Sequence, residues 1–137
     1  MRLVISDLRA HETEAAIALW EECGLTRPWN DPRADIALAL GKATSTVLAG
    51  RIDGKLVATA MTGSDGHRGW VYYLAVAKSA QRNGYGAQVM QAAADWLRTR
   101  DCPKLHVLIR SENLGVTAFY ASLGYEKSDT IMMAKKL

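Results

Sequence analysis

The chain has 137 residues, of which 49% are apolar and 23% are charged, and its formal net charge at pH 7 is +3. This composition is typical of a globular protein and excludes a disordered chain or a membrane protein. The length predicts one domain with a single core, residues 1–137. No run reaches the ~18 apolar residues of a transmembrane helix. The first residues also lack a signal peptide, so we expect a cytoplasmic protein with no membrane partner.

The cysteines and the basic residues argue against two further classes of protein. Cys23 and Cys102 lie far apart, without C-x-x-C spacing or paired histidines, so we expect neither a disulfide framework nor a bound metal. The basic residues are scattered rather than gathered on one helix, which argues against nucleic acid as a partner. A modest positive charge also suits a small ligand that carries several phosphates.

Helix and turn signals divide the first half of the chain. Apolar residues recur at helical spacing from Ala16 to Cys23, and Gly24 follows as a stop signal. Asp31 is placed to cap a second helix, whose first residue is Pro32. Asp53-Gly54 predicts a hairpin turn, because both positions tolerate positive φ. Together these signals predict a strand at 2–6, helices at 12–23 and 32–40, and strands at 45–52 and 56–64.

The second half of the chain contains a β-α-β unit. An amphipathic helix at 86–100 separates strands at 70–76 and 105–109, which predicts a parallel pair with a right-handed connection. A helix at 113–123 and a last strand at 130–135 complete the pattern. The order predicts a mixed α/β (α+β) fold, with helices on the faces of one sheet.

Two glycines lie at the mouth of the helix at 86–100, in the stretch Gln81-Arg82-Asn83-Gly84-Tyr85-Gly86. The first N–H groups of a helix have no partner inside it, and the helix dipole is positive there. Because glycines let a phosphate approach the backbone, the stretch predicts an anion-binding loop. Neither a Walker A loop nor a dinucleotide fingerprint fits, since Val89 stands where each requires a further glycine.

The glycine stretch matches the pattern Q/R-x-x-G-x-G/A, and a second pattern follows it. Asn113 and the run 118–125 match N-x-x-x-x-x-F-Y-x-x-L-G-F/Y. With both patterns in order, nearly the whole chain resembles the GNAT superfamily of acetyl-CoA-dependent N-acetyltransferases. Within it, residues 27–32 and 65–69 look like the small bacterial YpeA-type acetyltransferases. The resemblance implies a mixed central sheet of six to seven strands, about four flanking helices and a parallel strand pair that splays apart.

The same resemblance implies acetyl-CoA as co-substrate, with no metal. The pyrophosphate would lie on the amides of residues 82–87, and the pantetheine arm would lie beside the strand at 70–76. An amide of that strand would hold the negative charge on the thioester oxygen. The cofactor-binding residues implied in this way are Leu74, Ala75, Val76, Gln81, Arg82, Asn83, Gly84, Tyr85, Gly86, Ala87, Asn113 and Tyr120.

Tyr120 is the expected catalytic residue, because the family places there a tyrosine whose hydroxyl protonates the departing thiolate. Its spacing with Val116 and Leu123 also fits a core position, and a tyrosine can serve both purposes. The general base stays open. N-terminal acetyltransferases of this kind carry a glutamate two residues before an arginine on the preceding strand, and this chain has Leu108 before Arg110.

Two histidines and one loop are further candidates on the acceptor side. His67 and His106 could take a proton directly or through water, although a lone histidine is more often structural. Trp29, Asn30 and Asp31 lie where the family binds its acceptor, and an aromatic ring beside a carboxylate suits a cationic amine. The structural alternatives are that Asp31 only caps a helix and that Trp29 only packs.

These expectations describe an enzyme that moves an acetyl group from acetyl-CoA to a primary amine, either of a small metabolite or of a peptide N-terminus or lysine. The alternative is a regulatory module that binds coenzyme A without turnover; Leu108 is its best support, and Tyr120 argues against it. A nucleic-acid-binding domain would rest on charge alone and predicts salt-dependent binding. Exposed strand edges make a homodimer an option.

Overall fold

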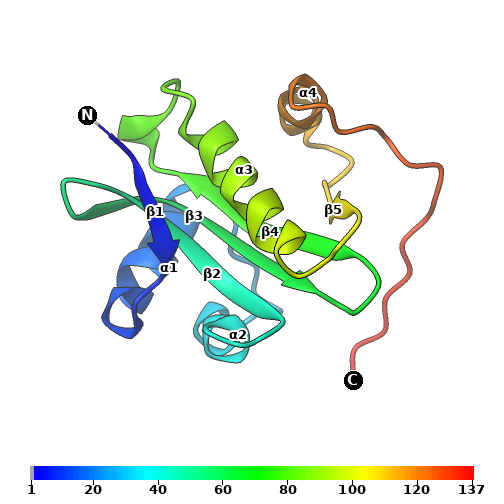
Figure 1. Cartoon of the computed structure of the whole chain (residues 1–137), viewed down its shortest axis with the longest axis horizontal. Helices are drawn as coiled ribbons and strands as arrows, with labels where there is room; N and C mark the ends of the chain where they lie inside the picture. Colours follow the sequence, from blue (N-terminus) through cyan, green and yellow to red (C-terminus); the bar gives the residue numbers. More distant parts are fainter. Residues whose placement is uncertain (1) are drawn as a thin grey trace.

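The computed structural model describes residues 2–137, which form one five-stranded sheet and four α-helices (Figure 1). The strands are β1 (Val4–Asp7), β2 (Ser45–Ile52), β3 (Lys55–Ser64), β4 (Gly69–Val76) and β5 (Leu105–Val107). The α-helices are α1 (Thr13–Glu22), α2 (Pro32–Ala39), α3 (Tyr85–Arg98) and α4 (Leu114–Ser122), and two short 3₁₀ turns are η1 (Ala10–Glu12) and η2 (Lys78–Ala80). None of these helices is both long and apolar enough to cross a membrane.

The strands follow chain order across the sheet, β1-β2-β3-β4-β5. Neighbours from β1 to β4 are antiparallel, whereas β4 and β5 are parallel. Because α3 connects β4 to β5, the predicted β-α-β unit is confirmed, and so is the mixed α/β fold with one sheet. The turn between β2 and β3 has the predicted positive φ values, 49° at Asp53 and 80° at Gly54.

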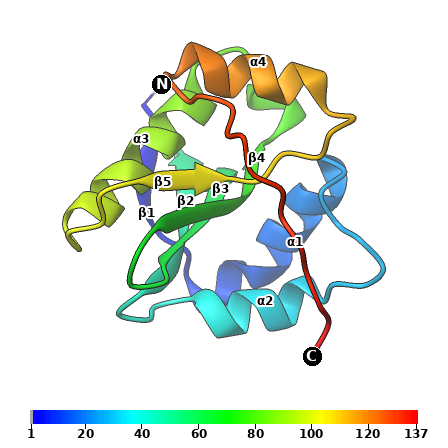
Figure 2. The same cartoon turned by 90° about the vertical axis from the view of Figure 1, so that its right-hand side faces the viewer.

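Helices cover both faces of the sheet and enclose two cores (Figure 2). On one face, α1 and α2 bury Trp20 and Ile36 against the sheet beside Val47 of β2. On the other face, α3 buries Val89 in the core that contains Leu48. Val47 and Leu48 are successive residues of β2, so their side chains point to opposite faces, as strand geometry requires.

The local signals at helix ends act as predicted. Pro32 is the first residue of α2, and Asp31 Oδ1 accepts hydrogen bonds from the amides of Arg33 at 3.0 Å and Ala34 at 3.2 Å. Gly24, just past α1, has a φ of 69°. The predicted helices differ from the observed ones by one or two residues at most ends, because the last turn of a helix depends on its surroundings.

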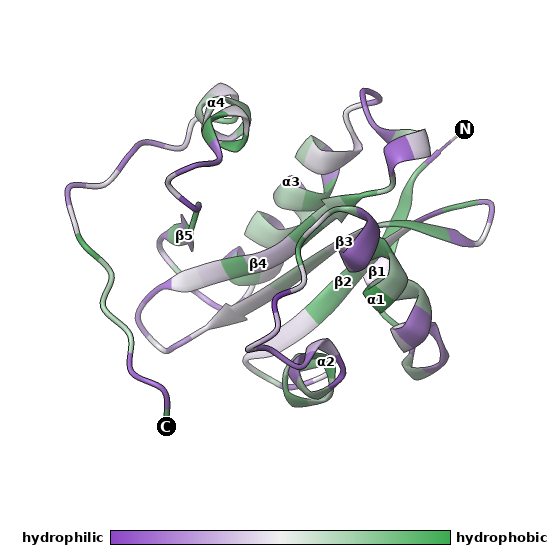
Figure 3. Ribbon diagram, turned by 180° about the vertical axis from the view of Figure 1, so that it is seen from behind, coloured by the Kyte–Doolittle hydropathy of each residue, from purple (hydrophilic) through white to green (hydrophobic). Residues whose placement is uncertain are grey.

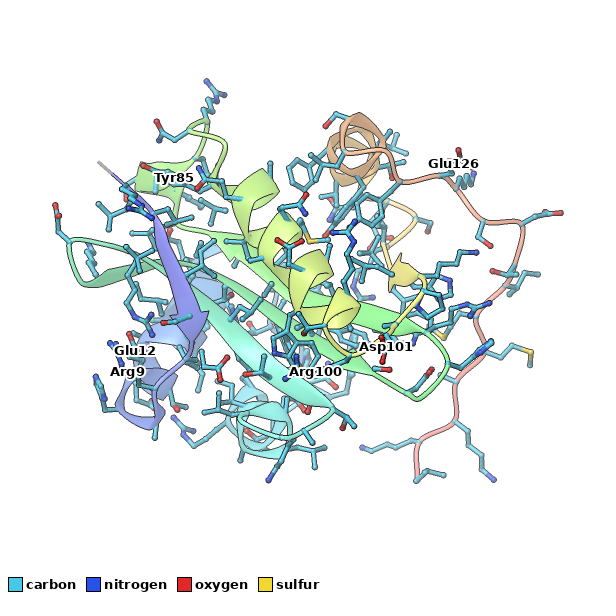
Figure 4. All side chains as sticks on the ribbon, viewed as in Figure 1. Arg9, Glu12, Tyr85, Arg100, Asp101 and Glu126 are labelled. Atoms are coloured by element: carbon cyan, nitrogen blue, oxygen red, sulfur yellow. The ribbon has the colours of Figure 1, made fainter. Side chains whose placement is uncertain are left out.

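A buried ion pair joins the start of α1 to the sheet. Glu12 is 8% exposed and accepts a hydrogen bond from Arg51 Nε, on β2, at 2.7 Å. The other guanidinium nitrogens donate to Ser6 Oγ at 2.8 Å and to the carbonyl of Asp7 at 3.1 Å. Figure 4 shows Arg9 and Glu12 close together, and the amide of Arg9 donates to Glu12 Oε1 at 2.9 Å. The bond from Arg51 lowers the pKa of Glu12 from 4.5 to about 2.

Three expectations about the sheet are wrong. The sheet has five strands rather than six to seven, and β5 ends at Val107 rather than at 109. Residues 130–135 form no strand; this segment runs apart from the sheet (Figure 3), with Ile131 91% exposed and Met133 92% exposed. Its apolar composition favours a strand, but a strand is stable only where a neighbour satisfies its N–H and C=O groups.

Candidate active site

A bulge makes β4 diverge from β5. The two strands pair only over residues 69–71 and 105–107, whereas β4 continues beside β3 as far as Val76. The register between β3 and β4 shifts next to Tyr73, which has a φ of 52°. Because a bulge adds one residue to a strand and bends it, the second half of β4 lies without β5 as a neighbour.

Leu74, Ala75 and Val76 lie on this unpaired half of β4. The carbonyl of Val76 accepts hydrogen bonds from two side chains, Gln81 Nε2 at 3.0 Å and Cys23 Sγ at 3.4 Å, instead of from a strand. In a strand the N–H and C=O of one residue point to the same side, and successive residues alternate. We therefore infer that Leu74 and Val76 present main-chain groups to the gap beside β4, where an extended ligand can bind as an added strand.

The amides before α3 and in its first turn have no protein partner. Within residues 2–137, no amide from Gln81 to Ala87 donates to a protein acceptor; the next one, of Gln88, donates to the carbonyl of Gly84 at 3.1 Å. A helix alone leaves only its first few amides unpaired. The loop before α3 adds further unpaired amides, and together they form a continuous row from Gln81 to Ala87. Tyr85 marks this end of α3 in Figure 4, and the helix dipole is positive there. The row can bind an anion with several oxygens.

The two loop glycines meet different needs. Gly84 has a φ of 78°, and no atom lies within 4 Å of the position that a Cβ would occupy, so a ligand can approach its backbone closely. At Gly86, a Cβ would stand 3.2 Å from Cζ of Phe119, so glycine there lets α4 pack on α3. Arg82 also has a positive φ, 66°, and turns of this kind form anion-binding nests.

Two side chains hold the loop in place. Asn83 Nδ2 donates to the carbonyls of Ala80 at 2.9 Å and Gln81 at 3.2 Å. The side-chain amide of Gln81 donates its hydrogen bond to the carbonyl of Val76 and thus ties the loop to β4. These side chains therefore fix the loop, and the exposed side chain of Arg82 is the group that adds charge to it.

Tyr120 is the buried residue of α4, with 7% of its surface exposed. Its ring meets those of Phe119 and Tyr125 edge to face, with centroids 5.1 Å and 5.5 Å away. Burial, and to a smaller extent Tyr125, raises the pKa of Tyr120 to about 12, so its hydroxyl is protonated at neutral pH. Asn113 is the N-cap residue of the same helix but makes no side-chain cap. The ring of Tyr120 is thus part of the core, and its hydroxyl is protonated, as a proton donor must be.

The acceptor-side candidates lie in the loop between α1 and α2. Asp31 caps α2, and the amide of Asn30 donates to the carbonyl of Arg27 at 3.1 Å. Trp29 is 60% exposed and is therefore not a core residue. The guanidinium of Arg110 lies over its ring, 5.6 Å from the centroid. The cation that faces the ring of Trp29 is therefore the side chain of Arg110, and not the amine of an acceptor.

Neither histidine lies at the unpaired half of β4. His67 is exposed in the turn before β4, where its amide donates to Asp65 Oδ1 at 2.8 Å. His106 stands opposite Trp70 in the β4–β5 ladder, and its buried Nδ1 has no partner among the described residues. Leu108, just beyond β5, is 47% exposed. Within residues 2–137, no three His, Cys, Asp or Glu side chains are placed to hold a metal ion.

One carboxylate that the sequence analysis missed lies beside the bulge. Asp35 Oδ2, on α2, accepts a hydrogen bond from the hydroxyl of Tyr73 at 2.8 Å. Burial, and then this bond, raises the pKa of Tyr73 to about 12. A signal was present in the sequence: Asp35 precedes Ile36 and lies one helical turn before Ala39, both of which are buried, so it borders the inner side of α2.

The sequence and the fold both match known acetyltransferases. The model of the acetyltransferase (GNAT) family matches residues 5–125. The chain belongs to the GNAT acetyltransferase family. An acetyltransferase of Yersinia pestis (strain Pestoides F) is 40% identical to it over 124 residues, which cover 90% of this chain and 88% of the relative. An acetyltransferase of Pectobacterium atrosepticum is 39% identical over 129 residues, covering 94% and 92%. The expected enzyme class is confirmed, and the YpeA-type subgroup stays a prediction.

Solved structures share the fold of this GNAT acetyltransferase. The aminoglycoside N-acetyltransferase AAC(6')-Iy, in complex with the bisubstrate analog CoA-S-monomethyl-acetylneamine, has a TM-score of 0.84 at 16% identity, covering 100% of this chain and 99% of that one. The ribosomal-protein-S18-alanine N-acetyltransferase from Escherichia coli has a TM-score of 0.78 at 23% identity, covering 93% and 79%. At sequence identities of 16% and 23%, these similarities establish a shared fold and nothing more specific.

Proposed function

We propose that this GNAT acetyltransferase moves the acetyl group of acetyl-CoA to a primary amine, either of a small metabolite or of a peptide N-terminus or lysine. The observation that carries the proposal is the row of unpaired amides from Gln81 to Ala87, beside the unpaired half of β4. A diphosphate is bound by such a row, and an extended chain with amides of its own suits a free strand edge. The coenzyme A analog in the AAC(6')-Iy structure supports the same donor here.

The residues of the chain fit this donor. The amides of residues 82–87 would hold the pyrophosphate, and the open space at Gly84 leaves room for it. The side chain of Arg82 adds a positive charge. The main chain of Leu74 and the N–H of Val76 would pair with the amides of the pantetheine arm, since the carbonyl of Val76 is already bonded to side chains. An amide near Leu74 would also donate to the thioester oxygen, where negative charge develops during the reaction.

Acetyl-CoA supplies the acetyl group as a thioester, and the amine displaces the thiol. The amine, after it has lost one proton to water, attacks the carbonyl carbon; a C–N bond forms and the C–S bond breaks. Tyr120 donates its hydroxyl proton to the departing sulfur and regains a proton that the attacking nitrogen gives up. In the overall reaction, an ammonium ion and acetyl-CoA are consumed. The products are an acetamide, the free thiol of coenzyme A and one proton.

Thiol release tests this proposal against the alternative of a module that binds coenzyme A without turnover. The purified protein is mixed with acetyl-CoA and a panel of small primary amines and short peptides, and the acetylated product is identified by mass spectrometry. We expect thiol and acetylated amine in equal amounts. Binding of coenzyme A without any acetylated product would support the module instead. No binding of coenzyme A by calorimetry, even at millimolar concentration, would overturn both.

Replacement of Gly84 by valine is expected to weaken coenzyme A binding about 5- to 30-fold. A branched residue does not tolerate the φ of 78° found there, at a cost of about 1–2 kcal/mol. The free loop would relax to another conformation, and binding would have to restore the strained one. Calorimetry on the variant measures this change.

Gly115 provides the matched control, because it lies in α4 with open space around it and no positive φ. Gly115→Ala should leave the affinity for coenzyme A unchanged and raise stability slightly. Unchanged affinity in Gly84→Val would contradict the assigned role of the loop.

A further inference from the structure

A cavity opens on the α2 face of the sheet, away from the residues assigned to the donor. It measures about 210 Å³ and is lined by Ala39 of α2, Met61 of β3, and Trp70 and Tyr72 of β4, with Asp65 of the turn between β3 and β4. Its walls are mainly apolar. Because it is smaller than the roughly 300–1,000 Å³ of pockets for drug-sized ligands, it suits a short apolar group.

Asp35 lies on α2, the helix that contributes Ala39 to the wall of this cavity. It stands one helical turn before Ala39. Its partner Tyr73 directly follows Tyr72 of the cavity wall. The bulge interrupts the usual alternation of side chains along β4, and as a result both tyrosines face α2. Asp35 is therefore hydrogen-bonded to the residue that stands in the chain between Tyr72, on the cavity wall, and Leu74, where the unpaired half of β4 continues.

The partner of Asp35 is firmly positioned. The ring of Tyr73 stacks on the indole of Trp20, with centroids 3.8 Å apart and planes within 6° of parallel. Trp20 Nε1 donates to Thr59 Oγ1 at 2.8 Å, and the hydroxyl of Thr59 donates to the carbonyl of Tyr73 at 2.9 Å. These bonds hold Tyr73 at its positive φ, a backbone strain of the kind found at functional sites.

The charge of Asp35 has no protein counter-ion. Among residues 2–137, the salt bridges join Glu14 to Arg33, Glu12 to Arg51 and Asp95 to Arg98, and none of them involves Asp35. Tyr73 donates a hydrogen bond but is neutral, because its pKa is about 12. A half-buried carboxylate with a neutral donor on one oxygen favours a cation as its second partner.

We propose that Asp35 binds the ammonium group of the acceptor and that the adjoining cavity binds its apolar flank. The acceptor class is then a small primary amine with a short aryl or alkyl body. The proposal rests on the function proposed above and identifies the acceptor side of the same site. Tyr73 acts as a positioning residue for Asp35. Trp29 is not needed for this contact, since its ring already faces Arg110.

Calorimetry on the protein saturated with coenzyme A tests the proposal, with phenethylamine as the probe and 2-phenylethanol as its neutral analogue of the same shape. We expect wild type to bind the amine more tightly than the alcohol. Asp35→Asn should weaken amine binding about 10- to 150-fold, the value of a hydrogen bond to a charged group, and reduce the preference for the amine over the alcohol to about one. The affinity for coenzyme A should not change.

Two further variants complete the test. Glu14→Gln makes the same chemical change at an exposed carboxylate near α2 and should leave both affinities unchanged. Tyr73→Phe keeps the ring and removes the hydroxyl, so amine binding should weaken by a smaller factor, about 2- to 12-fold. This variant gives the readout if Asp35→Asn does not fold.

Three results would overturn the proposal while leaving acetyl transfer intact. The first is wild-type amine affinity in Asp35→Asn. The second is a parallel loss for amine and alcohol, which would indicate a structural role only. The third is a wild-type protein that binds coenzyme A but prefers putrescine, whose alkyl chain ends in a second ammonium group that an apolar cavity would disfavour, to phenethylamine. Absence of coenzyme A binding in wild type would instead contradict the proposed function itself.

Discussion

Tyr120→Phe is expected to lower kcat about 10²- to 10⁴-fold, the usual contribution of a positioned proton donor, while the affinity for acetyl-CoA stays nearly unchanged. The substitution removes only the hydroxyl and keeps the buried ring that packs against Phe119 and Tyr125. Without the hydroxyl, the thiolate must leave unprotonated or wait for water. Steady-state rates of thiol release across the pH range, with coenzyme A affinity from calorimetry, measure both quantities.

Tyr125→Phe is the control for this prediction. Tyr125 is the neighbouring tyrosine, and burial also raises its pKa, but it lies past the end of α4. Its loss should leave kcat near the wild-type value. If Tyr120→Phe kept the wild-type rate at every pH, Tyr120 would have a purely structural role.

Glu12→Gln is expected to lower the free energy of unfolding by about 3–5 kcal/mol, because it leaves the guanidinium of Arg51 buried without a counter-ion. The same guanidinium holds Ser6 and Asp7 of β1, so the change also loosens the edge of the sheet. Urea unfolding at pH 7 measures the loss. Glu14→Gln, two residues on, alters an exposed ion pair and should change stability little.

The stabilisation by Glu12 should also depend on pH. A glutamate side chain has an ordinary pKa of 4.5, and the pKa of Glu12 in the folded protein is about 2. A lowered carboxyl pKa stabilises the folded state fully above 4.5, and the contribution is lost as the pH falls from 4.5 towards 2. The difference in unfolding free energy between wild type and Glu12→Gln should therefore narrow over that window. A difference that stays constant from pH 7 to pH 3 would contradict the assigned ion pair.

Much of the fold could be predicted because its signals are local. Asp31 and Pro32 define the start of α2 through bonds to residues two and three positions away. The Asp53-Gly54 turn needs only the positive φ of its own residues. The loop from Gln81 to Gly86 is likewise a property of one short stretch, which is why the sequence pattern alone indicated an anion-binding turn before α3.

Other features depend on residues that are far apart in the chain. Glu12 and Arg51 are separated by 39 positions, and Asp35 and Tyr73 by 38. No spacing rule brings such pairs together, because their contact requires α1 and α2 to pack on the sheet first. The bulge at Tyr73 has no local signal either, since tyrosine does not favour positive φ.

The sequence by itself determined where most helices and strands form, the glycine turn before α3 and the GNAT acetyltransferase family, because these follow from neighbouring residues and from motif order. Only the tertiary structure decided that β4 leaves β5 after residue 71, that residues 130–135 remain unpaired, and that Asp35 stands beside the bulge. The physical reason is that strand pairing and side-chain contact depend on which surfaces the folded chain brings together, and those surfaces are assembled from distant segments.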